Sequence, residues 1–81
     1  MVIITPTNKF KKDTKKLDLF NREKLEKQIR KIIENPEVGK PLRYKRGERC
    51  LYIKPFRLIY AVRGDGIILL KFGHRKDIYE E

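Results

Sequence analysis

Hydrophobic residues recur with a helical period in the first half of this chain and with a strand period in the second half. At the start, residues 2–5 form a β-branched run that stops at Pro6, which predicts a short strand. After residue 41, apolar runs alternate with turn-forming glycine and proline, which predicts four further strands. These strands are expected at residues 42–44, 49–54, 56–63 and 67–72.

Two helices are predicted between the first strand and the other four. Thr7 or Asn8 can cap the first helix, and Asn21 can cap the second, which ends at Asn35-Pro36. The apolar positions of the two helices are Phe10, Leu17 and Phe20, then Leu25, Ile29, Ile32 and Ile33. This order predicts an α+β domain in which a helical hairpin packs on one face of a four-stranded antiparallel meander.

The turn at Pro55 sets the expected pairing of two strands. Proline suits the second position of a tight turn, so the turn is expected to begin at Lys54 and to close at Arg57. Lys54 and Arg57 would then face each other across a hairpin, with both cations on one face of the sheet.

The glycine-rich turn at residues 64–66 sets the next pairing. With a two-residue loop, Arg57 would lie opposite Phe72, and His74 would be its diagonal neighbour at roughly 7–8 Å. With a three-residue loop, Arg57 would lie opposite Gly73, and Arg75 would be diagonal to it. Both alternatives bring the end of the last strand to Arg57.

The last two long strands are apolar on both faces, but a helical hairpin can cover only one. The face shared with Arg57 would also carry Ile59, Ala61, Ile68 and Leu70. Contiguous exposed apolar surface usually marks an interaction site, so a protein partner is one expected cover. The alternative is that the C-terminal tail folds back over the face that the helices leave uncovered.

Composition adds a strong positive charge to this picture. The chain has 81 residues, which suits one domain spanning residues 1–81, and its 21 Lys and Arg against 11 Asp and Glu give a formal net charge of +10. Such a field attracts polyanions, and RNA or DNA is the first candidate. The alternative is a solvated charged shell, but the acidic residues concentrate in the helical half and at the C-terminus, whereas cations dominate the strands.

The few cysteine and histidine residues limit the disulfides and metal sites that this chain could form. Cys50 is the only cysteine, which excludes an internal disulfide, fits a reducing cytosol and is typical of a small buried hydrophobe. One histidine, one cysteine and scattered carboxylates lack the spacing of a zinc site, so no metal and no cofactor are expected. No apolar stretch approaches the length of a membrane span, and we expect a cytoplasmic protein with no membrane partner.

Four short motifs resemble those of a known toxin family over nearly the whole chain. They are PL at residues 41–42, CLYIK at 50–54, FRLIY at 56–60 and FGHRKDIY at 72–79. In these motifs the chain resembles the RelE branch of the RelE/ParE toxin superfamily, particularly its archaeal members. The resemblance implies a microbial RNase fold of the RelE type and an mRNA interferase, which cuts the message in the ribosomal A site. It also implies a cognate RelB-like antitoxin, which would silence the toxin in a heterotetramer.

The family's functional residues map onto four positions. Lys54 matches the second of two lysines in the third strand, Arg57 the arginine of the fourth strand, Arg75 the arginine after the Gly-basic pair, and Tyr79 the C-terminal tyrosine. The chain departs from the family at Tyr52, which stands where the first lysine falls. In addition, the loop before Arg57 is shorter, and Tyr79 lies closer to Arg75 in the sequence.

Cleavage of RNA without a metal needs a base for the 2′-hydroxyl proton, cations for the charged phosphorane and an acid for the leaving oxygen. Arg57 and Arg75 suit the second task, because guanidinium binds phosphate through two parallel hydrogen bonds. The base is either Lys54, beside the two arginines, or His74, whose imidazole titrates near neutral pH. Tyr79 could stack on a base or donate its phenolic proton.

Other basic residues are candidates for RNA contact. Lysines in the first helix would bind rRNA backbone with a salt-dependent affinity. The full set of expected RNA contacts is Lys9, Lys11, Lys12, Lys15, Lys16, Lys45, Arg46 and Tyr52. Two rivals to the metal-independent endoribonuclease remain, namely a ParE-like toxin that poisons DNA gyrase and a non-catalytic RNA-binding module.

Overall fold

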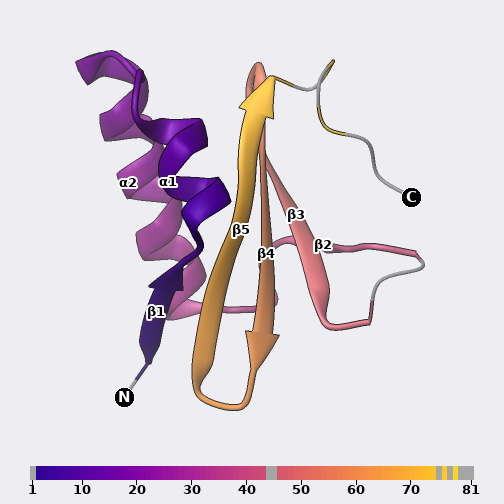
Figure 1. Cartoon of the computed structure of the whole chain (residues 1–81). Coiled ribbons are helices and arrows are strands. Elements are labelled where there is room, and N and C mark those ends of the chain that lie inside the picture. The colour runs from indigo at the N-terminus through magenta and orange to yellow at the C-terminus, as the bar shows by residue number, and fades with distance from the viewer. Residues whose placement is uncertain (1, 44–45, 75, 77, 79–81) are drawn as a thin grey trace.

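The computed structural model of the chain describes residues 2–43, 46–74, 76 and 78. Within these residues, five strands form one sheet, and two helices cover one of its faces (Figure 1). The elements are β1 (Ile3–Pro6), α1 (Asn8–Thr14), α2 (Leu19–Glu34), β2 (Lys40–Pro41), β3 (Glu48–Ile53), β4 (Phe56–Arg63) and β5 (Gly66–His74). The predicted α+β class and the order of its elements are therefore confirmed.

The sheet is mixed rather than a plain meander. Its strand order is β1-β5-β4-β3-β2, and all neighbours are antiparallel except β1, which pairs in parallel with β5. Ile3 lies opposite Gly66, and Pro6 lies opposite Leu69. The first strand thus extends the sheet that the last four strands build, and the chain passes through both helices before it enters the rest of the sheet.

The helix boundaries differ from those predicted. Thr7 caps α1, since its Oγ1 accepts a hydrogen bond from the Phe10 amide at 3.1 Å, as expected for one of the two candidate caps. The prediction that Phe20 lies on the apolar face of the first helix was wrong. Phe20 lies at the start of α2 with 68% of its surface exposed, and the cap position of α2 is Asp18 rather than Asn21. Apolar spacing alone could not locate this break, because Leu17 fits either helix.

The fourth and fifth strands pair through a register shift. Arg63 lies opposite Gly66, so Gly64 and Asp65 form a two-residue loop. A bulge next to Ile59 and Tyr60 then moves the pairing by one residue, and Arg57 lies opposite Gly73 rather than Phe72. The structure therefore combines the loop of one predicted alternative with the pairing of the other.

Each face of the sheet has its own apolar cluster. The larger cluster lies under the helices and contains Phe10, Leu25, Ile32, Ile53, Leu58, Tyr60, Ile67, Leu69 and Phe72. On the opposite face, Ile78 from the C-terminal tail packs with Cys50 and Ile59. A residue of the tail therefore covers part of that face, as one of the two predicted alternatives required. Among the described residues, no helix is both long and apolar enough to cross a membrane.

The second strand begins earlier than predicted. It was expected at residues 42–44, but Lys40 pairs with Cys50 and Pro41 pairs with Arg49. The Arg49 guanidinium holds the segment before it, donating to the carbonyl of Glu37 at 3.0 Å and to that of Gly39 at 2.6 Å. These contacts draw the chain leaving α2 against the edge of β3, where it pairs before the apolar Leu42.

Candidate nucleic-acid interface

Arg57 lies on the face of the sheet opposite the helices. Leu58 and Tyr60 point into the core under the helices, and side chains alternate along a strand, so Arg57 points the other way. Its cross-strand neighbours are Tyr52 on β3 and Gly73 on β5. The side chain is half-buried, and its Nε atom is buried. The sheet therefore positions this guanidinium instead of leaving it fully in solvent.

Tyr52 gives Arg57 an aromatic neighbour. The Arg57 Cζ atom lies 5.8 Å from the centre of the Tyr52 ring, within the range of a cation–π contact. Tyr52 nevertheless keeps 47% of its surface exposed. The two residues line a hollow of about 430 Å³ together with Val38, Lys40, Cys50 and Leu51. Val38 and Lys40 had no signal in the sequence, because the loop after α2 brings them to this place.

Lys54 does not face Arg57. Ile53 pairs with Phe56, so Lys54 and Pro55 form the loop itself, with a cis peptide bond between them. The prediction that the turn begins at Lys54 and closes at Arg57 was wrong, because the turn begins at Ile53 and closes at Phe56, which puts Pro55 at its third position. Lys54 is exposed at the tip of the hairpin, and its carbonyl accepts a hydrogen bond from the Lys24 ammonium at 2.9 Å.

His74 lies on the other side of the sheet from Arg57. It pairs with Phe56, and the two rings meet edge to face with their centres 6.3 Å apart. Phe56 in turn stacks on Phe72 of the core under the helices. The predicted diagonal contact between His74 and Arg57 was therefore wrong, and the bulge in the β4–β5 pairing is the reason. His74 Nδ1 accepts a hydrogen bond from the Lys76 amide at 3.2 Å.

Three of the predicted site residues lie outside the described residues. They are Arg75, Tyr79 and Lys45. The expected meeting of Arg57 with Arg75 therefore stays a prediction, and so does the role of Tyr79.

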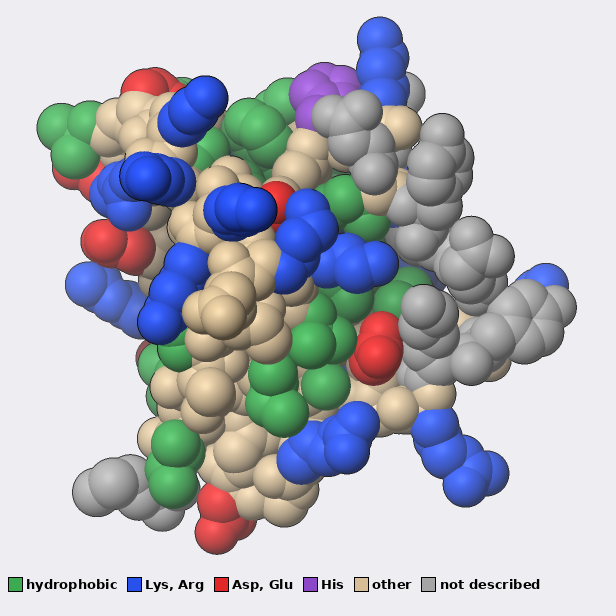
Figure 2. Space-filling view, in the orientation of Figure 1, with side chains coloured by type: hydrophobic (Ala, Val, Ile, Leu, Met, Phe, Trp, Pro, Cys, Tyr) green, Lys and Arg blue, Asp and Glu red, His purple; other side chains and the backbone are tan. Residues whose placement is uncertain are grey.

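The lysines of α1 form a separate basic surface. Asn8, Lys9, Lys11, Lys12 and Lys15 line a shallow hollow of about 500 Å³. Lys9 also pairs with Asp13 at 2.7 Å, which balances part of this charge. Figure 2 shows Lys and Arg side chains gathered over the helical part of the face in view. Lys15 and Lys16 were expected in the first helix but follow its end at Thr14, and both are exposed. The five lysines predicted there are therefore accessible to a polyanion.

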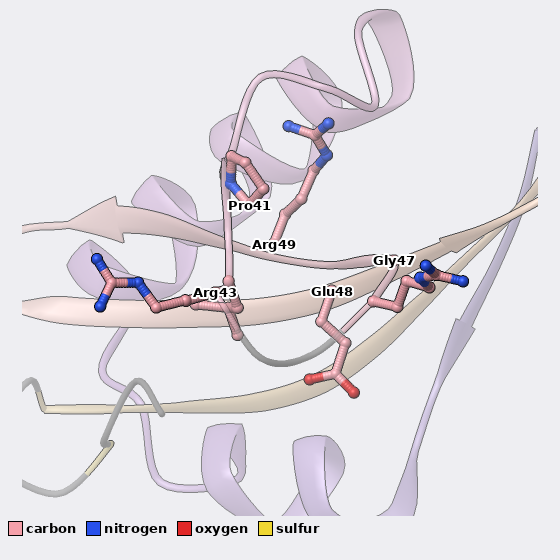
Figure 3. A pocket seen from close by; sticks show the side chains of 7 residues that line it. Pro41, Arg43, Gly47, Glu48 and Arg49 are labelled. Carbon is pink, nitrogen blue, oxygen red and sulfur yellow. The ribbon is translucent and has the colours of Figure 1, made fainter.

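A third hollow is rich in arginine but does not form a clamp. It has a volume of about 390 Å³ and is lined by Pro41, Leu42, Arg43, Arg46, Gly47, Glu48 and Arg49. In Figure 3 the guanidinium groups of Arg43 and Arg49 point away from each other, and the Glu48 carboxylate lies on a different side again. Arg49 is engaged with backbone carbonyls, so its role is structural. Within the described part of the chain, no group of three or more His, Cys, Asp or Glu residues could hold a metal ion.

The fold agrees with comparisons against known proteins. A family model described as the ParE toxin of type II toxin-antitoxin system, parDE, matches residues 4–79. The chain therefore belongs to this family of toxins, within the RelE/ParE superfamily, and is a toxin of a type II toxin–antitoxin system. A search of curated protein sequences found no match.

Solved structures show the same fold in toxins of both branches. The intact E. coli RelBE toxin-antitoxin complex aligns with a TM-score of 0.83 and 21% identity, covering 91% of this chain and 96% of that one. A copper-bound mutant toxin from Helicobacter pylori aligns with a TM-score of 0.79 and 28% identity, covering 98% and 100%. A chromosomal ParDE system from P. aeruginosa aligns with a TM-score of 0.69 and 20% identity, covering 91% and 96%.

Proposed function

We propose that this toxin is an endoribonuclease that cleaves mRNA in the ribosomal A site without a metal ion. The observation that carries the proposal is the half-buried Arg57 on the face opposite the helices, held beside Tyr52 and the hollow that also contains Lys40. A guanidinium fixed by a sheet is suited to bind the scissile phosphate through two hydrogen bonds. The excess of positive charge over the chain favours a nucleic-acid substrate.

The proposed reaction uses the 2′-hydroxyl of the substrate as the nucleophile. A base takes its proton while the oxygen forms a bond to phosphorus, and the bond from phosphorus to the 5′-oxygen breaks as an acid protonates that oxygen. Arg57 stabilises the charge that develops on the phosphoryl oxygens, and we propose that Arg75 shares this task. Tyr79 is the proposed stacking residue or acid.

Lys54 is the stronger candidate for the base. The His74 side chain lies on the same face of the sheet as Phe56, which is the face opposite Arg57. Lys54 is exposed at the tip of the β3–β4 hairpin, two residues from Tyr52. A flexible lysine side chain at that tip can reach around the end of the sheet. His74 remains the alternative base, and its position on the face of the sheet opposite Arg57 argues against it.

The rival with the same fold is a DNA gyrase poison, and the matches to the ParE toxin family model and to the ParDE structure are compatible with it. The second rival is a non-catalytic RNA-binding module. A cleavage assay on programmed ribosomes separates the endoribonuclease from both rivals. The wild-type toxin should cut the mRNA, and Arg57→Ala should lower the cleavage rate at least about 100-fold. A message with a 2′-deoxy nucleotide at the cut site should stay intact. Uncut message with wild-type protein would contradict the proposal, and linearised plasmid in the presence of gyrase would support the gyrase rival.

We propose a RelB-like antitoxin as the protein partner, in a heterotetramer, with ribosomal RNA and mRNA as nucleic-acid partners in the cytoplasm. The E. coli RelBE complex supports this partner by analogy of fold. Co-expression with the protein encoded beside the toxin should restore growth and yield a complex on size exclusion. Normal growth when the toxin is induced alone would contradict it.

A further inference from the structure

The hollow beside Tyr52 has the features of a site for one nucleotide. We infer that it binds an unstacked nucleobase of single-stranded RNA, stacked on the Tyr52 ring, with a neighbouring phosphate held by Lys40 and Arg57. This rests on the proposed function, and it names a part of the substrate that the cleavage chemistry does not require. It also assigns a role to Tyr52, which stands where the RelE branch has the first lysine of its pair.

The exposure of Tyr52 is the first observation. Within β3 the side chain stands on the same face as Cys50, which is buried, yet 47% of Tyr52 is exposed. The contact with Arg57 orients the ring from the β4 side. An oriented and accessible aromatic ring is what proteins that read single-stranded RNA offer to an unstacked base.

The lining of the hollow is the second observation. Its volume of about 430 Å³ suits one nucleotide, and Val38 and Leu51 supply apolar wall, whereas Lys40 and Arg57 supply positive charge. A base needs apolar contact on its faces, and its phosphate needs cations at the rim. Both kinds of surface occur here within one hollow.

The edge of β3 is the third observation. The Glu48 carbonyl accepts a hydrogen bond from the Leu42 amide, so the backbone groups of residues 48, 50 and 52 point toward the β2 side of the strand. The strand β2 begins at Lys40, which lies opposite Cys50. The amide and carbonyl of Tyr52 therefore point to the sheet edge beyond β2, where they can meet the polar edge of a base.

An extended peptide could also add to such an edge, but the charges favour RNA. Among the described residues that line the hollow, two are cations and none is a carboxylate. A peptide strand would gain little from Lys40 and Arg57 unless it were acidic, whereas every nucleotide carries a phosphate. The nucleotide is therefore the occupant to test, and the peptide is an outcome that would overturn the inference.

The experiment measures binding without cleavage. Fluorescently labelled toxin is titrated with ribosomes that carry a 2′-O-methyl codon in the A site, either intact or abasic at one of its three positions. The variants are Tyr52→Phe, which keeps the ring, and Tyr52→Ile, which keeps a strand-forming side chain. Phe20→Ile is the matched control, because Phe20 is an exposed aromatic residue on α2. Circular dichroism verifies that each variant is folded.

Stacking predicts a specific pattern of affinities. Tyr52→Ile should weaken binding about tenfold, and Tyr52→Phe and Phe20→Ile should bind like wild type. At one of the three codon positions, removal of the base should weaken the binding of wild type about tenfold as well. With that abasic codon, Tyr52→Ile should bind as tightly as wild type. Equal affinity of wild type and Tyr52→Ile for the intact codon would overturn the inference, as would an effect of Tyr52→Ile that persists with every abasic codon.

Two further results separate this inference from the proposed function. If Arg57→Ala abolishes cleavage while Tyr52→Ile binds every codon like wild type, the endoribonuclease stands and the nucleobase site falls. If Arg57→Ala cleaves like wild type, the proposed function falls on its own. A Tyr52→Ile variant that loses only the antitoxin would assign the hollow to a peptide.

Discussion

Arg57 and His74 point to opposite faces of the sheet, although they lie on neighbouring strands. Arg57 pairs with Gly73, so His74 pairs with Phe56 and follows it toward the core under the helices. A sheet separates the imidazole from the guanidinium. This arrangement makes His74 a poor candidate to take a proton from a substrate whose phosphate is bound by Arg57.

The first prediction compares these two residues in a cleavage assay. His74→Gln should cleave at a single-turnover rate within about tenfold of wild type, whereas Lys54→Met should lose about 100-fold or more in that rate if Lys54 is the base. Single-turnover rates on programmed ribosomes give both values. A large loss for His74→Gln together with a small loss for Lys54→Met would reverse the assignment of the base.

The second prediction concerns Tyr60, the largest fully buried side chain among the described residues. Its hydroxyl donates to the Pro36 carbonyl at 2.8 Å and accepts from the Gly39 amide at 2.8 Å, which ties the loop after α2 to the sheet. Tyr60→Phe should lower the free energy of unfolding by about 1–3 kcal/mol, because both backbone groups lose their partner. Urea denaturation measures the change, with Tyr52→Phe as the control for an exposed phenol.

The same residue predicts a loss of stability in alkali. Burial raises the pKa of the Tyr60 phenol above its usual value, against smaller opposing effects of the Gly39 hydrogen bond and of Arg49. The unfolded chain therefore releases this proton at a lower pH than the folded chain does. The contribution is fully present below about pH 10 and is lost as the pH rises through the folded pKa. When the pH is raised from about 9 to about 11, the free energy of unfolding should fall less for Tyr60→Phe than for wild type, as measured by urea midpoints.

The fold was largely predictable from the sequence, because local patterns determine most of it. The apolar run before Pro6, the stripe along α2 and the runs between glycine and proline each correspond to an element. The break between the helices was harder to locate, since Leu17 packs against the core while Leu19 and Phe20 are exposed. The parallel pairing of β1 with β5 depends on contacts between the ends of the chain and has no local signal.

The candidate site was predictable only in part. Alternation along the strand separates Arg57 from Leu58 and Tyr60, but it does not say which of the two faces the helices cover. The cross-strand neighbours of Arg57 were predictable only in part, because the β3–β4 turn begins at Ile53 instead of Lys54 and a bulge moves the β4–β5 pairing by one residue. The turn therefore places Tyr52 opposite Arg57 in place of Lys54. The bulge places Gly73 opposite Arg57, as one of the two predicted alternatives required, and turns His74 to the other face.

Asp13 gives a fourth prediction, on the attachment of α1 to the sheet. Its Oδ2 accepts a hydrogen bond from the Phe72 amide at 3.0 Å, and its Oδ1 accepts one from Lys9 at 2.7 Å. Asp13→Ala should destabilise the fold by about 1.5–3 kcal/mol, because a buried amide loses a charged acceptor. Lys9→Ala is the control and should change stability by less than about 1 kcal/mol, since the Lys9 side chain is 63% exposed. Equal effects of the two substitutions would show that the ion pair, and not the bond to β5, provides the stability.

The fifth prediction concerns the lysines of α1 and the salt dependence of ribosome binding. Each lysine that neutralises an rRNA phosphate releases a counterion, so binding weakens as salt rises. Replacing Lys11 and Lys12 with glutamine should reduce the slope of log K against log salt by about 1.5–2, because two phosphate contacts are lost. The control replaces Lys27 and Lys31 of α2, which removes the same charge outside the hollow of α1. Binding is measured by anisotropy over a salt series. Equal slopes for the two double variants would mean that only net charge matters, and an unchanged slope for the Lys11 and Lys12 variant would remove α1 from the interface with rRNA.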